Sequence, residues 1–321
     1  MLSLTGVLRE EQPRINAALE KETAALPESV RAIAAHTLNA GGKRLRPLLA
    51  VYMGRLFGCT DPAVYTIAAA IEFFHVATLI HDDVLDNATT RRGIPAAHEI
   101  YTPTAAILGG DAMLAHSARM IAKIGDAFIS QQFAEAVMAT AVGEIDEFTH
   151  QGDIDISYEQ YLGMITGKTA WSLKAACQVP AHFAGASPEQ VDAAATFGLE
   201  LGIAFQIVDD ALDIAPSKDT GKPSGGDLRE RKCTPLTKFY YAGLNDAAKK
   251  DFAAKFKAGS FTEAEIETII AIMQAKGLDE QTRDLAEEHL ERAKTALALL
   301  PENKERKVLA LVPDFIKNRG N

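Results

Sequence analysis

The sequence is poor in the residues that mark several common classes of protein. Only three cysteines occur in 321 residues, and Cys59, Cys177 and Cys233 are far apart. We therefore expect neither a disulfide framework nor a cysteine-based metal site, and we expect a cytoplasmic protein. Lysine and arginine (33) are outnumbered by aspartate and glutamate (43), and the net charge of −10 argues against a nucleic-acid partner.

Signals for secretion and for strands are scarce as well. The first residues lack a basic segment followed by an apolar core, so we expect no signal peptide. No apolar run approaches the roughly 20 residues that a membrane-spanning helix needs. Alternating Val, Ile and Thr runs between paired tight turns are also missing, which argues against a sheet.

Helical signals are present along nearly the whole chain. Apolar residues recur at three- and four-residue spacing, and alanine is abundant. Ser157 with Gln160, and Thr262 with Glu265, fit the capping box that begins a helix. We expect an all-α fold of about ten helices in a single large bundle. The longest helices are expected at residues 62–86, 104–123, 127–150, 158–178 and 188–214.

An acidic cluster occurs twice, each time at the end of a long apolar stretch. Residues 81–86 read His-Asp-Asp-Val-Leu-Asp, and residues 208–213 read Val-Asp-Asp-Ala-Leu-Asp. On a helix, carboxylates four residues apart share one face, with roughly 5–6 Å between their Cβ atoms. Such carboxylates repel one another and also oppose the dipole at a helix C-terminus. A solvated helix end could explain one cluster, but two favour a divalent cation such as Mg²⁺.

Basic residues stand beside both clusters and predict an anionic ligand. Residues 41–47 read Gly-Gly-Lys-Arg-Leu-Arg-Pro, so three cations follow a glycine pair that ends an expected helix. Arg91 and Arg92 follow the first cluster, and Lys222 and Lys232 follow the second. Each of these residues alone would more often be a surface residue. Their placement beside both acidic clusters indicates a phosphate group held by arginine and lysine.

Taken together, these motifs resemble those of the trans-isoprenyl diphosphate synthases, also called polyprenyl synthetases. The resemblance covers about residues 41–236, and its pattern is closest to the long-chain polyprenyl diphosphate synthases. The matching segments, in order, are residues 41–47, the first aspartate motif with Arg-Arg-Gly (82–93), Gly110-Asp111, Lys168-Thr169, the second aspartate motif (205–213), and Gly221-Lys222-Pro223 through Asp227.

The resemblance implies a single all-helical domain over residues 1–321, with long helices around a deep central cavity, and a homodimer. It also implies a prenyltransferase that uses about three Mg²⁺ ions per active site, with Mn²⁺ as a substitute. In the implied reaction, metal ions bridge both aspartate motifs and the diphosphate of an allylic substrate, whose C1–O bond ionises. The double bond of isopentenyl diphosphate attacks the carbocation, and the released diphosphate takes up a proton. Apolar walls exclude water, and membrane contact is at most peripheral, for product release.

The resemblance assigns roles to individual side chains. The catalytic set that it implies is Asp82, Asp86, Asp209, Lys168 and Gln206. The metal ligands that it implies are Asp82, Asp86, Asp209 and Asp213, with Asp213 and Asp83 more typical of water-mediated contacts. The residues that match the isopentenyl diphosphate site are Lys43, Arg46, His75 and Arg92. The residues that match the allylic diphosphate site are Arg91, Lys168, Thr169, Gln206 and Lys222.

The resemblance also bears on product length. One helical turn rises about 5.4 Å, close to one isoprene unit, so residues one or two turns before Asp82 would form the cavity floor. Ala77 and Thr78 stand there and are small, as in long-chain synthases, whereas Phe74 or Met113 would stop growth earlier. We expect a long all-trans polyprenyl diphosphate, with a short-chain farnesyl or geranylgeranyl diphosphate as the alternative.

One segment departs from the family, and other interpretations stay open. After the second motif, the usual Glu-Gly-Lys-x-Thr-Leu-Pro is replaced by Glu-Arg-Lys-Cys-Thr-Pro at residues 230–235, which leaves the role of Lys232 open. The role of Arg319 is open too. The alternatives are a terpene cyclase, a non-catalytic subunit of a heteromeric synthase, and a helical scaffold that binds Ca²⁺ adventitiously. The intact second aspartate motif and basic residues argue against the first two.

Overall fold

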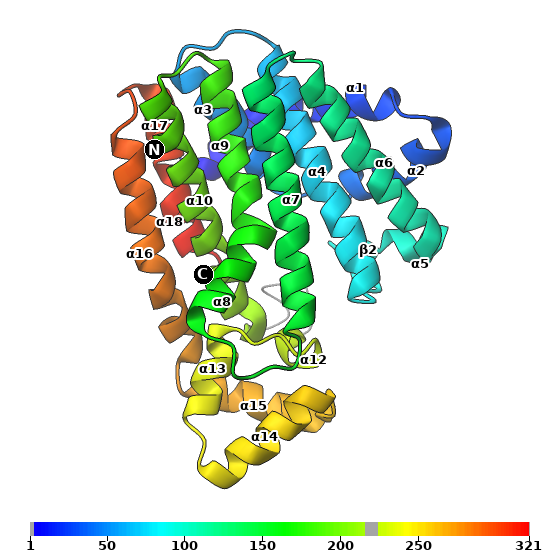
Figure 1. Cartoon of the computed structure of the whole chain (residues 1–321), viewed down its shortest axis with the longest axis vertical. Helices are drawn as coiled ribbons and strands as arrows, with labels where there is room; N and C mark the ends of the chain where they lie inside the picture. The colour runs from blue at the N-terminus through cyan, green and yellow to red at the C-terminus, as the bar shows by residue number, and fades with distance from the viewer. Residues whose placement is uncertain (1–2, 216–223, 321) are drawn as a thin grey trace. The chain divides into compact units, whose positions relative to one another are not determined.

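The computed structural model describes residues 3–215 and 224–320, and these residues confirm the all-α class (Figure 1). The chain divides into two compact units. Unit 1 comprises Met1–Val137, Ser172–Gly198 and Thr295–Val312, and unit 2 comprises Met138–Trp171, Leu199–Lys294 and Pro313–Asn321. The expected single domain over residues 1–321 stays a prediction.

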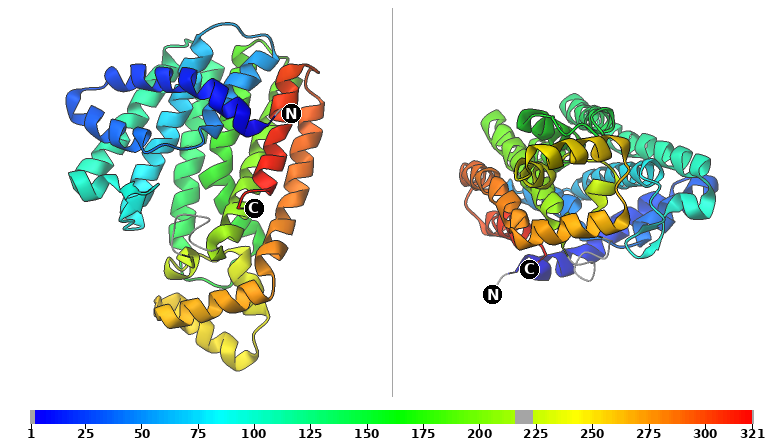
Figure 2. Two further views of the ribbon diagram at one scale, coloured as in Figure 1. Left: turned by 180° about the vertical axis from the view of Figure 1, so that it is seen from behind. Right: turned by 90° about the horizontal axis from the view of Figure 1, so that it is seen from below.

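Unit 1 is built around a long apolar helix. That helix, α4 (Ala63–Leu85), begins where the Ala63 amide donates to the Asp61 carboxylate at 2.8 Å, and it packs along α6. Figure 2 shows α1 running across α4, which it contacts. The elements that lie within unit 1 are α1 (Leu4–Ala24), α2 (Glu28–Asn39), α3 (Leu45–Leu56), α4, β1 (Thr90–Arg91), β2 (Ile94–Pro95), α5 (Ala97–Tyr101), α6 (Pro103–Ala122) and α17 (Lys304–Leu309).

Unit 2 contains shorter helices and two tight helical turns. The elements that lie within it are α8 (Tyr158–Ile165), the π-helical turn η1 (Thr166–Ala170), the 3₁₀ turn η2 (Leu212–Ile214), α12 (Gly226–Arg229), α13 (Pro235–Ala242), α14 (Asp246–Ala258) and α15 (Glu263–Ala275). Helices α14 and α15 form an antiparallel hairpin (Figure 1). The helices with residues in both units are α7 (Ala127–Thr149), α9 (Trp171–Phe183), α10 (Pro188–Ala211), α16 (Leu278–Ala298) and α18 (Leu311–Lys317).

Most expected helix boundaries are confirmed within about two residues. Both expected capping boxes are present, at the starts of α8 and α15. The helix expected at 158–178 is wrong in one respect, because the π turn η1 separates α8 from α9. The helix expected at 188–214 ends at Ala211 and continues as the 3₁₀ turn η2. The small hairpin β1–β2 was not expected from the sequence.

The expectation about apolar run length is corrected. Two helical stretches, Ala63–Leu85 and Pro188–Ile214, are long and apolar enough by length and composition to cross a membrane, with mean hydropathies of 1.7 and 1.4. In each stretch 67% of the most apolar window is buried inside the protein. That burial is typical of core helices, because a helix that is apolar on all faces packs inside its fold.

Candidate active site

The glycine pair that ends α2 turns the chain so that neighbouring basic residues take different directions. Gly41 and Gly42 have φ values of 87° and 132°, and Arg44 enters α3 with a φ of 49°. This backbone directs Arg44 inward, where its Nη1 donates to Glu72 Oε1 at 2.7 Å and its Nη2 donates to the Leu38 carbonyl at 2.5 Å. Both partners of the ion pair are buried, with 6% and 3% of their side chains exposed. Arg44 is therefore structural.

The four residues predicted to hold isopentenyl diphosphate all lie in unit 1. Lys43 is exposed, and Arg46 donates from Nε to the Ser172 hydroxyl at 2.9 Å. Arg92 donates to the Gly41 carbonyl, which brings it beside the loop that carries Lys43. Burial, followed by the nearby Arg46 and Arg92 cations, places the pKa of His75 well below its usual range. The structure thus places Arg46 and Arg92 near an imidazole that is kept neutral and can donate a hydrogen bond.

The first aspartate motif lies at the C-terminal end of α4. Asp86 is the residue that caps the helix, and its amide donates to the Asp82 carbonyl at 2.8 Å, one turn apart as expected. Asp83, which is 1% exposed, points inward and accepts from Arg91 Nε at 2.7 Å. The hairpin β1–β2 returns Arg91 to this position. Asp83 Oδ2 has no hydrogen-bond partner among the described residues.

The four residues considered for product length also lie in unit 1. Phe74, Ala77 and Met113 are buried with at most 1% exposure. The Phe74 ring packs edge-on against Phe133, with 5.7 Å between the ring centroids. Thr78 is half-buried, and its hydroxyl donates to the His75 carbonyl at 2.8 Å. Thr78 is therefore the most accessible of the four.

Two glycines allow the π turn η1, which carries Lys168 and Thr169 of the predicted allylic site, to pack closely against α7. A Cβ on Gly143 would overlap the backbone nitrogen of Lys168, and a Cβ on Gly167 would lie 2.9 Å from the Gly143 Cα. Only residues without a side chain allow α7 and η1 to approach so closely. The Thr140 hydroxyl also donates to the Gly167 carbonyl at 3.4 Å. Lys168 and Thr169 follow Gly167 within this π turn, and π turns are frequent at functional sites.

Lys168 and Lys232 meet at one glutamate. Lys168 Nζ lies 2.8 Å from Glu147 Oε1 and 2.8 Å from Glu144 Oε2. Lys232 Nζ lies 3.3 Å from the same Glu147 oxygen and 2.6 Å from Glu230 Oε2. Burial opposes the ionisation of Glu147, but the two lysines outweigh it and lower the pKa of this carboxyl. The structure therefore brings Lys232, whose role was open, beside Lys168.

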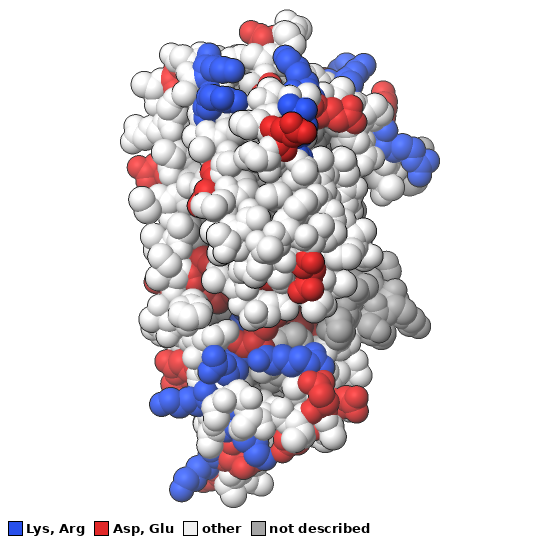
Figure 3. All heavy atoms as spheres, turned by 90° about the vertical axis from the view of Figure 1, so that its right-hand side faces the viewer, with Lys and Arg blue, Asp and Glu red and all other residues white. Residues whose placement is uncertain are grey.

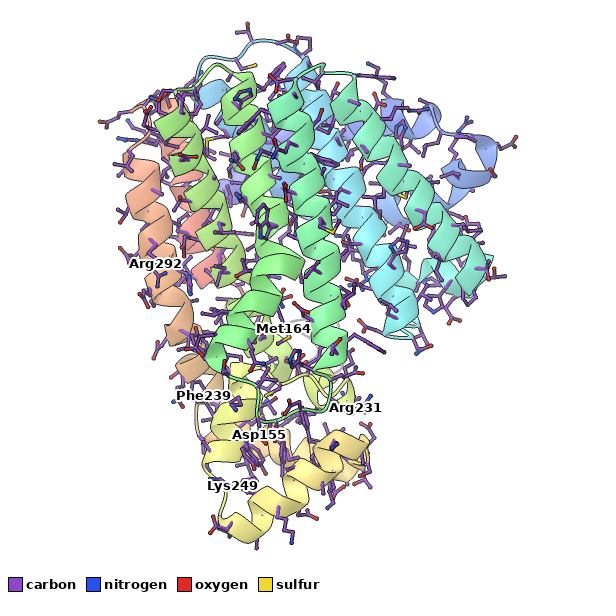
Figure 4. All side chains as sticks on the ribbon, in the orientation of Figure 1. Asp155, Met164, Arg231, Phe239, Lys249 and Arg292 are labelled. Atoms are coloured by element: carbon purple, nitrogen blue, oxygen red, sulfur yellow. The ribbon has the colours of Figure 1, made fainter. Side chains whose placement is uncertain are left out.

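A hydrogen-bonded chain orients Gln206. The Thr169 hydroxyl donates to Gln206 Oε1 at 2.7 Å, and Gln206 Nε2 donates to Asp210 Oδ1 at 2.8 Å. Tyr161 donates to the other Asp210 oxygen at 2.5 Å. Burial raises the pKa of Asp210 to about 7. A cavity of about 90 Å³ in unit 2 is lined by residues that include Tyr161, Lys168, Gln206, Asp210 and Met164. Figure 4 labels Met164 on α8.

The carboxylates of the second aspartate motif have three different surroundings. Asp209 is 45% exposed and pairs with Arg319 at 3.1 Å, and the Arg319 guanidinium lies 4.1 Å from the Phe205 ring centroid. Asp210 is buried and accepts hydrogen bonds from Gln206 and Tyr161. Asp213 accepts from the Asp227 amide at 3.3 Å at the start of α12, and burial raises its pKa to about 6. The predicted residue Lys222 lies outside the described residues.

The described carboxylates fit a hard cation that completes its coordination with other oxygens. Over residues 3–215 and 224–320, no three His, Cys, Asp or Glu side chains gather as a ready-made metal site. The first motif instead places Asp82 and Asp86 one helical turn apart, whereas in the second motif Asp209 lies on α10 and Asp213 lies in the 3₁₀ turn that follows it. Mg²⁺ suits this arrangement, since it binds one or two carboxylates together with water and phosphate oxygens.

Sequence reasoning missed Glu72, Glu144, Glu147 and Tyr161. Glu72 had a usable signal, because a glutamate within an apolar helical stretch is almost never fully buried unless it is paired. Glu144 and Glu147 lie one turn apart after Gly143, but nothing local indicated which cations they would meet.

The chain is similar to known proteins in sequence and in fold. The sequence model of the family described as Polyprenyl synthetase matches residues 27–273. Octaprenyl diphosphate synthase from Escherichia coli is 34% identical over 302 residues, covering 94% of this chain and 93% of the relative. A short chain isoprenyl diphosphate synthase from Methanothermobacter thermautotrophicus is 31% identical over 326 residues, covering 99% of each. A solved polyprenyl synthase from Caulobacter crescentus, complexed with calcium and isoprenyl diphosphate, has a TM-score of 0.93 and 32% identity, covering 99% of this chain and 97% of that chain.

Proposed function

Because the chain belongs to the polyprenyl synthetase family and is a prenyltransferase, we propose that it condenses isopentenyl diphosphate with an allylic prenyl diphosphate in a Mg²⁺-dependent reaction. The proposed product is a long-chain all-trans polyprenyl diphosphate. The observation that carries the proposal is the pair of aspartate motifs, each at the C-terminal end of a long helix and each accompanied by basic residues within its own unit.

Unit 1 supplies the groups proposed to bind isopentenyl diphosphate. Lys43, Arg46 and Arg92 carry positive charge toward a diphosphate, and arginine can contact two phosphate oxygens at once. His75 is neutral because its pKa is lowered, so it donates a hydrogen bond without adding charge. The Arg44–Glu72 pair lies one turn before His75 and supports this region from within the core.

Unit 2 supplies the groups proposed to bind the allylic diphosphate. Lys168 and Lys232 contribute two ammonium groups that already share one carboxylate. Thr169 and Asp210 hold the Gln206 amide in a single orientation, so its dipole needs no reorganisation while positive charge develops on the allylic carbon. Arg91 of unit 1, and Lys222, which lies outside the described residues, complete the proposed set.

The proposed metal ligands are Asp82 and Asp86 in unit 1, and Asp209 with Asp213 in unit 2. When bound, about three Mg²⁺ ions would neutralise the negative charge that develops on the leaving diphosphate, with Mn²⁺ as a substitute. Asp213 already holds the start of α12 through backbone amides, which favours a water-mediated contact for this residue.

The condensation balances without a further reactant. The allylic C1–O bond breaks, and its electron pair leaves with the diphosphate. The double bond of isopentenyl diphosphate forms the new bond to C1, and the released diphosphate accepts the proton that is lost. Buried side chains such as Phe74 and Ala77 keep water from the cation.

We also propose a homodimer in the cytoplasm, with at most peripheral membrane contact. In unit 2, α7 exposes Met138, Val142, Ile145 and Phe148 at helical spacing, with 45–71% exposure. In unit 1, α6 exposes Ile107 and Leu108. Figure 3 shows that charged side chains gather in groups on one face and leave a broad area uncharged. A second copy would cover such apolar helix faces, since large exposed patches mark protein interfaces.

A product assay tests the proposed reaction. Purified protein is incubated with Mg²⁺, labelled isopentenyl diphosphate and, separately, dimethylallyl, geranyl, farnesyl and geranylgeranyl diphosphates. Asp209→Asn is expected to lower turnover by at least about a hundredfold. Asp192→Asn makes the same change at an exposed position of the same helix and is expected to retain turnover. No incorporation with any starter would reject the proposal for this chain alone.

Product length is read from the same assay after dephosphorylation. Products beyond the geranylgeranyl length support growth past Ala77 and Thr78, whereas a stop at farnesyl or geranylgeranyl supports the short-chain alternative. Thr78→Phe is expected to shorten the product, because it places a ring at the most accessible of the four positions. Thr66→Phe makes the same change at another half-buried position of α4 and serves as the control.

A further inference from the structure

Glu147 forms ion pairs with both Lys168 and Lys232. Its Oε1 atom accepts from Lys168 at 2.8 Å and lies 3.3 Å from Lys232 Nζ. Two ammonium groups at one oxygen atom would repel each other without a negative charge between them. The carboxylate of Glu147 therefore keeps the two lysines together.

Each of the two lysines also contacts a second carboxylate. Glu144 contributes a second carboxylate to Lys168, and Glu230 contributes one to Lys232. Among the described residues, the carboxylates of Glu144, Glu147 and Glu230 thus contact the two ammonium groups in a half-buried region, where charges are screened less than in water. An anion that approaches the lysines must compete with carboxylates already in contact with them.

The backbone sets the positions of the carboxylates and of Lys168. Gly143 lies against the π turn that carries Lys168, and Glu144 and Glu147 follow it on the same helix, one turn apart. Glu147 and Lys168 are both about 20% exposed, and both line the cavity in unit 2 together with Lys232. An anion in that cavity meets the lysines and Glu147 at the same time.

We propose that Glu147 is a positioning residue that holds Lys168 and Lys232 as one anion site and limits its affinity by competing with the diphosphate for both ammonium groups. This inference rests on the proposed function, in which the two lysines bind the allylic diphosphate. It adds a residue that sets how tightly that diphosphate is held.

The proposed reaction requires that the two-lysine site does not bind diphosphate too tightly. Each condensation leaves inorganic diphosphate at the site where the next allylic diphosphate must bind. A two-lysine site without a competing carboxylate would retain the released diphosphate and slow the next cycle. Glu147 lowers the affinity enough for release while it keeps both lysines in position for the new substrate.

Glu147→Gln tests the inference, because it removes the charge and keeps the size of the side chain. Binding of inorganic pyrophosphate to the full chain is measured by calorimetry at fixed Mg²⁺ and at low and high salt. We expect pyrophosphate to bind about tenfold more tightly to the variant at low salt, with a smaller gain at high salt. In steady-state assays, the KM for the allylic substrate and kcat are both expected to fall, as slow product release requires.

The chain provides matched controls on the same helix. Glu144→Gln removes a carboxylate that contacts Lys168 alone, so a smaller gain in affinity is expected. Asp146→Asn makes an equal charge change at an exposed position, and no gain is expected. Glu147→Asp keeps the charge and is expected to bind pyrophosphate like the parent protein, which separates a charge effect from a folding defect.

Unchanged or weaker pyrophosphate binding in Glu147→Gln, with parent-like thermal unfolding, would overturn the inference. The same result in Glu147→Gln and Asp146→Asn would overturn it too, because net charge would then explain the effect. Failure of the proposed allylic site is distinguishable. In that case Lys168→Gln and Lys232→Gln would leave pyrophosphate affinity unchanged, whereas the inference alone fails if both weaken it and Glu147→Gln does nothing.

Discussion

Breaking the buried ion pair between Arg44 and Glu72 is expected to destabilise the protein by about 3–5 kcal/mol. Glu72→Gln removes one charge and conserves volume, so no cavity contributes to the cost. The Arg44 guanidinium then has only neutral acceptors among the described residues, the Leu38 carbonyl and the Gln amide oxygen, and no carboxylate to balance its charge. Its Nε already has no hydrogen-bond partner among the described residues, and 94% of the side chain is shielded from water. An uncompensated buried charge of this kind is costly relative to the 5–15 kcal/mol that typically stabilises a fold.

The measurement is urea unfolding followed by circular dichroism, with the change in midpoint compared at constant slope. Glu288→Gln is the matched control, because it breaks an exposed ion pair with Arg292 one turn away on α16, where the side chains are 76% and 48% exposed. That control is expected to cost at most about 0.5 kcal/mol. A loss in Glu72→Gln of no more than the control loss would refute the reasoning. Replacing Arg44 and Glu72 together by Met and Leu is expected to recover most of the stability.

Two further predictions concern packing and pH. Gly143→Ala is expected to cost about 1–3 kcal/mol and to raise the KM for the allylic substrate, because the added methyl group overlaps the backbone of Lys168. Gly163→Ala, whose Cβ meets nothing within 4 Å, is the control, and equal unfolding midpoints in the two variants would contradict the prediction. His75 has a lowered pKa in the folded protein, so the unfolded chain takes up the proton first as pH falls below about 6.5, and stability declines there. His75→Gln is expected to reduce the loss of unfolding free energy between pH 7 and pH 5, measured from unfolding curves at each pH. The same pH dependence in the variant and the parent protein would contradict this prediction.

Several features of the fold and site could be read from the sequence, because their physical causes are local. The capping box at Thr262 and Glu265 satisfies backbone groups within a single turn, so it predicts where α15 begins. The four-residue spacing of Asp82 and Asp86 likewise requires only a helix to place both carboxylates one turn apart. The motif order indicated the family for the same reason, since it is a property of the chain itself.

Other features depend on contacts between distant parts of the chain. Arg44 and Lys43 are neighbours with the same charge, yet Arg44 is buried against Glu72, 28 positions away, because its backbone turns inward at a positive φ. The expected continuous helix at 158–178 failed because the π turn forms where Gly167 meets α7, and helical periodicity contains no information about that meeting.

The sequence by itself determined which residue types were available: two aspartate motifs, a set of cations and long apolar helices to carry them. Only the tertiary structure decided which cation meets which carboxylate. Asp83 forms an ion pair with Arg91, Glu72 with Arg44, and Glu147 with both Lys168 and Lys232. The physical reason is range: helix capping and periodicity act over one or two turns, whereas an ion pair forms wherever packing brings opposite charges within about 4 Å.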